Sequence, residues 1–163
     1  MLTEIKYNRE KVFNYAKKWA YKRNPEYLNF DEYGGDCTNF ASQCLLAGSS
    51  VMNFIPIMGW YYLNAYNRTP SWTSAEALGQ FLLNNKGQGP YAVAVYPNEI
   101  QIGDIVQLQD SSGTHYHSFI ICGVTRNEIY VAGHSEDRWM YPLSNYKFVN
   151  FRFIHITNAR KEK

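Results

Sequence analysis

The sequence predicts an α+β fold in which N-terminal helices pack on a C-terminal antiparallel β-sheet. Apolar residues recur at helical spacing in three segments before residue 86. From residue 91 onward, short β-rich segments are separated by turns. Helices that come first and closely connected strands that follow indicate an antiparallel sheet. The 163 residues suit one compact core, so residues 1–163 are assigned to a single domain.

The first helix is predicted over residues 8–23, with Asn8 as its N-cap. Its inward face is apolar and comprises Val12, Phe13, Ala16, Trp19 and Ala20. Asn24 stands before Pro25, and a residue before proline disfavours the helical conformation. The helix should therefore end at this point.

The second helix follows two glycines that permit a tight turn, with Asp36 as the expected N-cap. Apolar and small residues then share one face: Cys37, Phe40, Ala41, Cys44, Leu45 and Gly48. Gly48 is expected to lie just past the end of the helix, where glycine commonly adopts the left-handed conformation.

Cys37 lies in the first turn of this second helix. A helix N-terminus stabilises an anion by about 0.3–1 kcal/mol, which favours the thiolate, the nucleophilic form of cysteine. The opposing interpretation is inert packing, because free cysteine is among the most buried residue types.

Residues 49–73 form a long, aromatic-rich connection with little periodicity. In a small domain such a segment is either functional or a flap over the core. Accordingly, Trp60 and Trp72 either line a substrate groove or pack inside. A third helix is expected after the capping box at residues 73–76, and it should end near Asn84.

Strands are predicted at residues 91–96, 104–108, 117–124, 129–132 and 151–157. The turn after Val124 should pair that residue with Ile129. Counting outward from this pair places His117 opposite Glu136. His134 then becomes a diagonal neighbour of His117 on the same face, at a Cβ separation of about 5–8 Å.

Composition, net charge and cysteine count limit the classes of protein to which the chain can belong. Hydrophobic residues make up 45% of the chain and aromatic residues 17%, enough for a core and an aromatic groove. The formal charge of +2 is far below that of a nucleic-acid-binding domain, although it would tolerate an acidic polymer such as a bacterial cell wall. Three cysteines, an odd number, argue against a disulfide framework.

No apolar run is long enough to cross a bilayer, and residues 1–6 do not resemble a signal peptide. Localisation stays open, because the chain could be a domain of a longer exported protein, which would make it extracellular or associated with the cell wall. The oligomeric state is equally open.

Cys37 and His117 supply the residue types of nucleophilic catalysis. If the Cys37 helix packs on the sheet, His117 can take the thiol proton and leave a thiolate–imidazolium pair, while a second polar group orients the imidazole. A zinc site of Cys37, His115 and His117 is the alternative, but no carboxylate or second cysteine is clearly spaced for it. We expect no metal and no cofactor. His155 receives no role, and Cys44 and Cys122 are expected in the core.

Several motifs resemble the bacterial putative amidase domain. They are Gly35-Asp36-Cys37-Thr38-Asn39-Phe40-Ala41-Ser42-Gln43, Gly59-Trp60-Tyr61-Tyr62, Ser71-Trp72-Thr73, Gly103-Asp104-Ile105-Val106-Gln107-Leu108, and His117-Ser118 at the start of a strand. The resemblance extends from about Tyr7 to Ile156. That domain is grouped with the NlpC-type and CHAP cysteine hydrolases, a papain-like group that acts on cell-wall peptides.

The resemblance implies a papain-like (NlpC-type) core and hydrolysis of an amide bond in peptidoglycan peptides. Cys37 takes the nucleophile position, His117 the base, and His134 the third polar position, with Glu136 or Asp137 as alternatives. The Gly103-Asp104 turn takes a structural role.

The oxyanion would be stabilised by the backbone N–H of Cys37 and by a second donor, such as the backbone N–H of Asp36 or a tyrosine hydroxyl. Asp36, Trp60 and Trp72 are the candidate substrate-binding residues. The competing hypothesis is a non-catalytic module that binds cell wall or peptide on the same fold.

Overall fold

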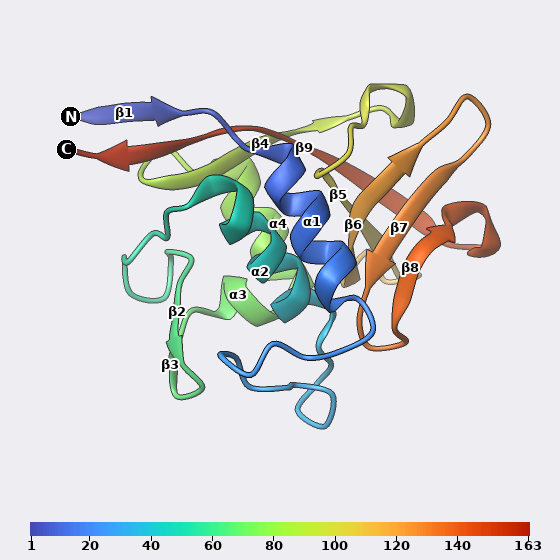
Figure 1. Ribbon diagram of the computed structural model, residues 1–163, viewed down its shortest axis with the longest axis horizontal. Helices are drawn as coiled ribbons and strands as arrows, with labels where there is room; N and C mark the ends of the chain where they lie inside the picture. Colours follow the sequence, from blue (N-terminus) through green and yellow to red (C-terminus); the bar gives the residue numbers. More distant parts are fainter.

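The computed structural model describes residues 1–163 as helices packed on a seven-stranded sheet with the strand order β1-β9-β5-β6-β7-β8, and with β4 also paired to β9 (Figure 1). The strands of this sheet are β1 (Leu2–Ile5), β4 (Gly89–Val95), β5 (Ile105–Gln109), β6 (His115–Val124), β7 (Ile129–Gly133), β8 (Arg138–Pro142) and β9 (Asn150–Glu162). Every strand pair is antiparallel, so the predicted α+β class is confirmed.

The helices are α1 (Arg9–Trp19), α2 (Cys37–Ser49), α3 (Pro70–Thr73) and α4 (Ala75–Asn84). A small hairpin, β2 (Tyr62–Asn64) and β3 (Asn67–Arg68), and two 3₁₀ turns, η1 (Pro97–Glu99) and η2 (Leu143–Asn145), complete the chain. The sequence did not reveal β1, β8, the small hairpin or α3. No helix combines the length and the apolar character that crossing a bilayer requires.

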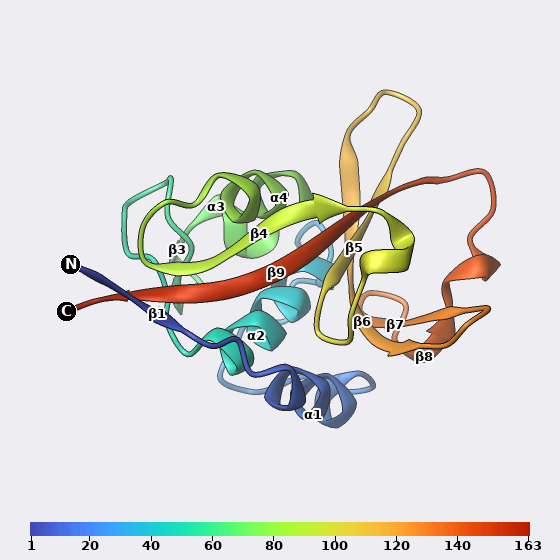
Figure 2. The ribbon, with the colours of Figure 1, turned by 90° about the horizontal axis from the view of Figure 1, so that it is seen from above.

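The predicted helix start at Asn8 is confirmed by its cap, because the Asn8 side chain accepts from the backbone N–H of Lys11 at 3.1 Å. The capping box expected at residues 73–76 is wrong by one residue: α4 begins at Ala75, and the side chain of Ser74 accepts from Ala77 at 3.3 Å. The first helix ends at Trp19, earlier than expected. The two chain ends meet, because β1 pairs with the end of β9, as Figure 2 shows from above.

The expected end of the second helix is wrong. The helix continues through Gly48 to Ser49, and the left-handed residue is Ser50, with φ 59°. Gly48 is needed for packing, because a Cβ there would lie 2.4 Å from Val12 Cγ2 and 2.7 Å from Tyr7 Cε1. Glycine thus lets α1 approach α2 closely.

The helices cover one face of the sheet, and the main core of 21 buried residues lies between the two layers. Trp60 and Trp72 belong to this core and are both 0% exposed. Their expected place on a substrate wall is therefore wrong, and the alternative of core packing is correct. The Trp60 indole N–H donates to Ser42 Oγ at 3.1 Å, and that of Trp72 to Asn39 Oδ1 at 2.9 Å, so both polar atoms are satisfied inside.

The sheet register differs from the predicted register by one residue. Val124 pairs with Ile129 as expected, but an irregularity follows, and Ile121 pairs with Val131. Continued four residues outward, this register places His117 opposite Ser135, not Glu136. A slip of one residue moves side chains to the other face of a sheet. The irregularity in β6 therefore separates His134 from the face on which we expected it.

Candidate active site

Cys37 lies where the first turn of α2 meets the start of β6. Gly34 and Gly35, at φ 97° and 104°, make the turn that leads into the helix, a conformation that glycine adopts without steric cost. Thr38 Oγ1 lies 3.1 Å from Ser118 Oγ, and the Cys37 sulfur lies 3.7 Å from Thr38 Oγ1. The Ser118 backbone also lies close enough to the sulfur to lower the pKa of the Cys37 thiol. Ser118 directly follows His117 in β6, so the sulfur lies near the part of the strand that carries His117.

His117 packs its ring on Phe119, with the ring centroids 4.1 Å apart. Its Nε2 atom is buried and has no hydrogen-bond partner. An unpaired buried polar atom is costly in a native protein and calls for an explanation. No hydrogen bond joins this imidazole to the Cys37 sulfur. The two residues are connected through Ser118, which follows His117 and whose backbone lies near the sulfur.

Burial controls the charge of both groups. It raises the pKa of the Cys37 thiol above its usual value, against weaker lowering by hydrogen bonds from Ser118 and Thr38. Burial alone lowers the pKa of His117 to about 4. Both side chains are therefore neutral at pH 7. The thiolate–imidazolium pair expected from the helix N-terminus is not the resting state, because desolvation outweighs the helix dipole.

Asp36 occupies the N-cap position of α2, but its side chain does not cap the helix. Oδ1 accepts from the Phe30 backbone N–H at 2.8 Å and from Asn39 Nδ2 at 2.9 Å, and Oδ2 accepts from His134 Nδ1 at 2.5 Å. Burial raises the pKa of this carboxyl, but the bonds from His134, Asn39 and Phe30 together bring it below the usual value. Asp36 is 0% exposed, so its assignment as a substrate-binding residue is wrong.

His134 lies just after β7, on the side of the sheet covered by the helices. Its Nδ1 bonds Asp36, its Nε2 bonds the Trp19 carbonyl oxygen at 2.9 Å, and its ring packs on Phe40 with the centroids 4.2 Å apart. Both ring nitrogens are engaged. In this structure His134 therefore does not hydrogen-bond His117.

The two alternative orienting residues have other partners as well. Glu136 pairs with Arg138 at the surface, and Asp137 pairs with Arg23. Ser135 lies in the turn that follows β7, and its Oγ accepts the backbone N–H of Asp36 at 2.9 Å. No local pattern in the sequence marks Ser135, because its partner is distant in the chain.

The other histidines form ion pairs away from Cys37. His115 Nδ1 lies 2.8 Å from Glu76 Oε2, and His155 Nδ1 lies 2.8 Å from Asp104 Oδ2. No group of three His, Cys, Asp or Glu side chains is placed to hold a metal ion, so the zinc set considered above is not assembled. The two remaining cysteines are buried in the core, as predicted.

The first turn of α2 offers backbone N–H groups to an anion. The first N–H groups of any helix have no partner within the helix, and here no side chain caps them. Of the two backbone donors considered for the oxyanion, the Asp36 N–H is already donated to Ser135. The N–H of Cys37 is therefore the stronger candidate.

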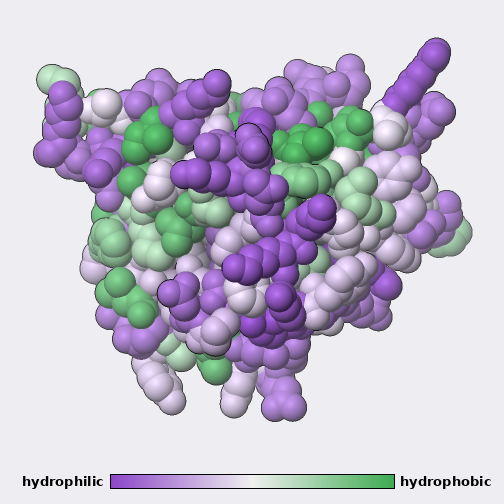
Figure 3. All heavy atoms as spheres, in the orientation of Figure 1, coloured by the Kyte–Doolittle hydropathy of each residue, from purple (hydrophilic) through white to green (hydrophobic).

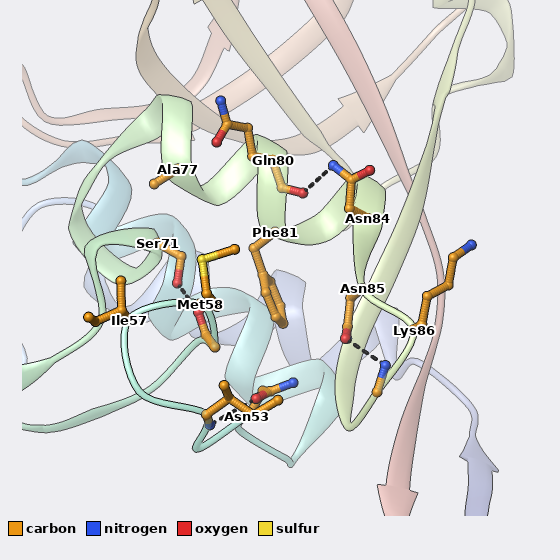
Figure 4. A pocket seen from close by; sticks show the side chains of 13 residues that line it. Asn53, Ile57, Met58, Ser71, Ala77, Gln80, Phe81, Asn84, Asn85 and Lys86 are labelled. Carbon is orange, nitrogen blue, oxygen red and sulfur yellow. Dashed lines mark hydrogen bonds between the residues drawn. The ribbon is translucent and has the colours of Figure 1, made fainter.

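The main cavities lie elsewhere. One of about 440 Å³ opens between residues 53–59 and α4, with Phe81 in its wall, as Figure 4 shows. Ile57 and Met58 at its rim are 73% and 77% exposed, and Figure 3 shows apolar surface on this side of the molecule. Two further cavities measure about 630 and 610 Å³. None of the three is lined by Cys37 or His117.

Fold and site together define an α+β domain. Its Cys37 lies at the N-terminus of α2, which packs against the start of β6, the strand of the antiparallel sheet that carries His117. The chain belongs to the putative amidase domain family, whose sequence model matches residues 6–156. This membership supports an amidase-like, and hence hydrolase-like, domain.

Two relatives come from Bacillus subtilis (strain 168), and both are described as uncharacterized proteins. YhbB is 35% identical over 120 residues, which cover 72% of this chain and 37% of the relative. YjcM is 28% identical over 149 residues, which cover 86% of this chain and 34% of the relative. The chain thus spans about a third of the length of these relatives. No solved structure matches it.

Proposed function

We propose that the domain is a cysteine-dependent amide hydrolase with Cys37 as nucleophile and His117 as general base and acid. One observation carries this proposal: the Cys37 sulfur lies close to the backbone of Ser118, the residue that follows His117, and the Nε2 atom of His117 is buried and has no partner. Membership of the amidase family supports the same reaction class.

The neutral resting pair determines how the reaction starts. As the sulfur attacks the amide carbonyl, the thiol proton passes to His117, and catalytic hydrogen bonds of this kind often form only in the substrate complex. The tetrahedral oxyanion accepts from the free N–H of Cys37. His117 then gives its proton to the leaving amine as the C–N bond breaks, and a thioester remains. Water, deprotonated by His117, hydrolyses this thioester and restores the thiol.

None of the candidates for the third catalytic position hydrogen-bonds His117. His134 has the position that the family resemblance suggests, but its nitrogens serve Asp36 and Trp19. Ser135, in the turn after β7, accepts the backbone N–H of Asp36 with its Oγ. We propose that His117 acts with Cys37 as a dyad, and that His134 contributes through Asp36.

The proposed substrate is a peptide amide bond of bacterial peptidoglycan, and the proposed architecture is papain-like, as in the NlpC-type and CHAP hydrolases. The motifs around Cys37 and His117 support this grouping. The mildly basic chain, with a formal charge of +2, suits an acidic polymer. No nucleic acid is expected as a partner, because a positively charged footprint is lacking.

A non-catalytic binding module is the competing candidate. The raised pKa of Cys37 favours it, because a buried neutral thiol is typical of inert cysteines. The free Nε2 of His117 opposes it, since a binding module has no need of an unpartnered imidazole beside a cysteine.

Digestion of purified cell walls, followed by mass spectrometry of the released fragments, tests the function. We expect wild type and Cys44→Ala to release fragments and Cys37→Ala to release none. Cys44→Ala is the matched control, because Cys44 lies on the same helix but is buried in the core. Equal release by wild type and Cys37→Ala would refute the assignment.

Iodoacetamide labelling separates the hydrolase from the binding module. In a hydrolase, Cys37 should react faster than Cys44 and Cys122, and His117→Ala should slow the labelling of Cys37 because the proton acceptor is lost. Equally slow labelling of all three cysteines would favour the binding module.

A further inference from the structure

The buried His134 ring has a hydrogen-bond acceptor at each nitrogen. Nδ1 faces the Asp36 carboxylate at 2.5 Å, and Nε2 faces the Trp19 carbonyl oxygen at 2.9 Å. An ionised carboxylate and a backbone carbonyl accept hydrogen bonds and cannot donate them. The His134–Asp36 pair is sealed from water, with side-chain exposures of 2% and 1%.

The same pair leaves the start of α2 uncapped. An aspartate at the N-cap ordinarily accepts from the second or third backbone N–H of its helix, which here belong to Thr38 and Asn39. The Asp36 carboxylate instead accepts from His134, from the Asn39 side chain and from the Phe30 backbone N–H, and its Oδ2 forms an ion pair with Arg23 Nε at 3.4 Å. Among these contacts, the one with His134 is the shortest.

We propose that His134 is a positioning residue that holds the Asp36 carboxylate away from the first turn of α2, so that no negative charge stands beside the N–H of Cys37 when the oxyanion forms there. This inference rests on the proposed function and deepens it. The buried histidine thereby acts on the reaction without touching His117 or the substrate.

The physical reason is electrostatic repulsion between the Asp36 carboxylate and the oxyanion. Released from His134, the carboxylate can turn to the ordinary capping position over Thr38 and Asn39. A full negative charge would then stand next to the N–H of Cys37, where the oxyanion develops, and the two like charges would repel. Removal of one oxyanion donor typically slows turnover by about 10²–10³-fold.

His134→Ala tests the proposal, with His155→Ala as the matched control. His155 also pairs with a buried carboxylate, Asp104, but it lies on β9 and not at α2. We expect His134→Ala to lower kcat by about tenfold or more, with KM within about twofold of wild type. Alkylation of Cys37 by iodoacetamide should change less than about twofold, because that reaction forms no oxyanion. An unchanged kcat, or equal losses of kcat and of alkylation rate, would overturn the proposal.

A second substitution separates positioning from simple support of the fold. Adding Asp36→Asn to His134→Ala should recover part of the lost kcat, because a neutral amide can cap the helix without repelling the oxyanion. A structural role predicts that the double variant is no better than His134→Ala, and that result would count against the proposal. His134→Gln should retain more activity than His134→Ala, because its amide can still donate to Asp36.

Amide hydrogen exchange provides a readout that does not depend on turnover. The N–H groups of Thr38 and Asn39 should exchange more slowly in His134→Ala than in the wild type, because the released carboxylate would accept from them. If the amide exchange of Thr38 and Asn39 were unchanged in a folded His134→Ala protein, the proposed role of His134 would be wrong. If the wild type itself shows no hydrolysis, the proposed function fails, whereas the exchange experiment still decides whether His134 restrains Asp36.

Discussion

The hydroxyl groups of Thr38 and Ser118 lie 3.1 Å apart, and each belongs to the residue that directly follows one member of the proposed pair, Cys37 or His117. This contact joins the first turn of α2 to the start of β6. Ser118 Oγ also accepts from Gln107 Nε2 at 3.1 Å, so β5 takes part in the same junction. The distance between nucleophile and base is thus set by a buried polar contact between two distant parts of the chain.

Thr38→Val should weaken this junction. Valine has nearly the shape of threonine but lacks its hydroxyl, so the expected loss is that of one buried hydrogen bond, about 1 kcal/mol of unfolding free energy. The proposed hydrolysis should slow as well, because Cys37 is next to the altered side chain. Urea unfolding measures the first effect, with Thr157→Val on the exposed side of β9 as the control. Unchanged stability and turnover would show that the contact does not set the geometry.

Acid should destabilise the protein through His117. Its pKa is lowered to about 4 by burial, whereas an unfolded histidine titrates near about 6.5. Below about pH 6.5 the unfolded chain binds a proton that the folded site refuses, so stability is lost as the pH falls toward 4. At pH 4.5 this cost is on the order of 2 kcal/mol. His117→Gln should remove it, and urea midpoints of both proteins from pH 7 to 4.5 check this. Parallel pH curves for wild type and variant would contradict the assigned burial.

Gly48→Ala should destabilise the contact between α1 and α2, although alanine is the better helix former by about 1 kcal/mol. The new methyl group would lie 2.4 Å from Val12 Cγ2 and 2.7 Å from Tyr7 Cε1. Overpacking of this kind costs about 1–3 kcal/mol. Thermal unfolding measures the net effect. Gly87→Ala is the control, since its nearest neighbour would lie at 3.6 Å, and a higher melting temperature for Gly48→Ala would contradict the packing argument.

Asp104→Ala should unfold the protein more readily than any surface substitution. The buried carboxylate accepts from Arg9 and His155, each at 2.8 Å, and from the backbone N–H groups of Gln101 and Ile156, each at 2.9 Å. Removing one partner of a buried charged pair costs about 3–5 kcal/mol. Guanidinium unfolding checks this value, with exposed Glu136→Ala as the control. A loss no larger than that of the control would show that the Gly103-Asp104 turn does not hold the strands together.

Local features of the structure could be predicted well. The cap at Asn8, the start of a helix at Cys37, and the pairing of Val124 with Ile129 each depend on residues close together in the chain. Hydrogen bonds and apolar spacing within a few residues carry that information, so one sequence suffices to find them. The α+β class follows from the same local patterns.

The arrangement of the candidate site could be predicted only in part. The sequence placed Cys37 near His117, but it also placed His134 beside His117 and Asp36 toward the substrate. An irregularity in β6 shifts the register by one residue and leaves His134 facing Asp36, 98 positions away in the chain. No pattern among neighbouring residues encodes such a shift.

By itself, the sequence determined the fold class, the helix starts and the residue types of the candidate pair, because these depend on short-range periodicity and capping. Only the tertiary structure decided that Trp60 and Trp72 are core residues, that burial keeps Cys37 and His117 neutral, and that His134 serves Asp36. Burial and strand register arise from contacts between distant segments, and such contacts exist only once the chain has folded.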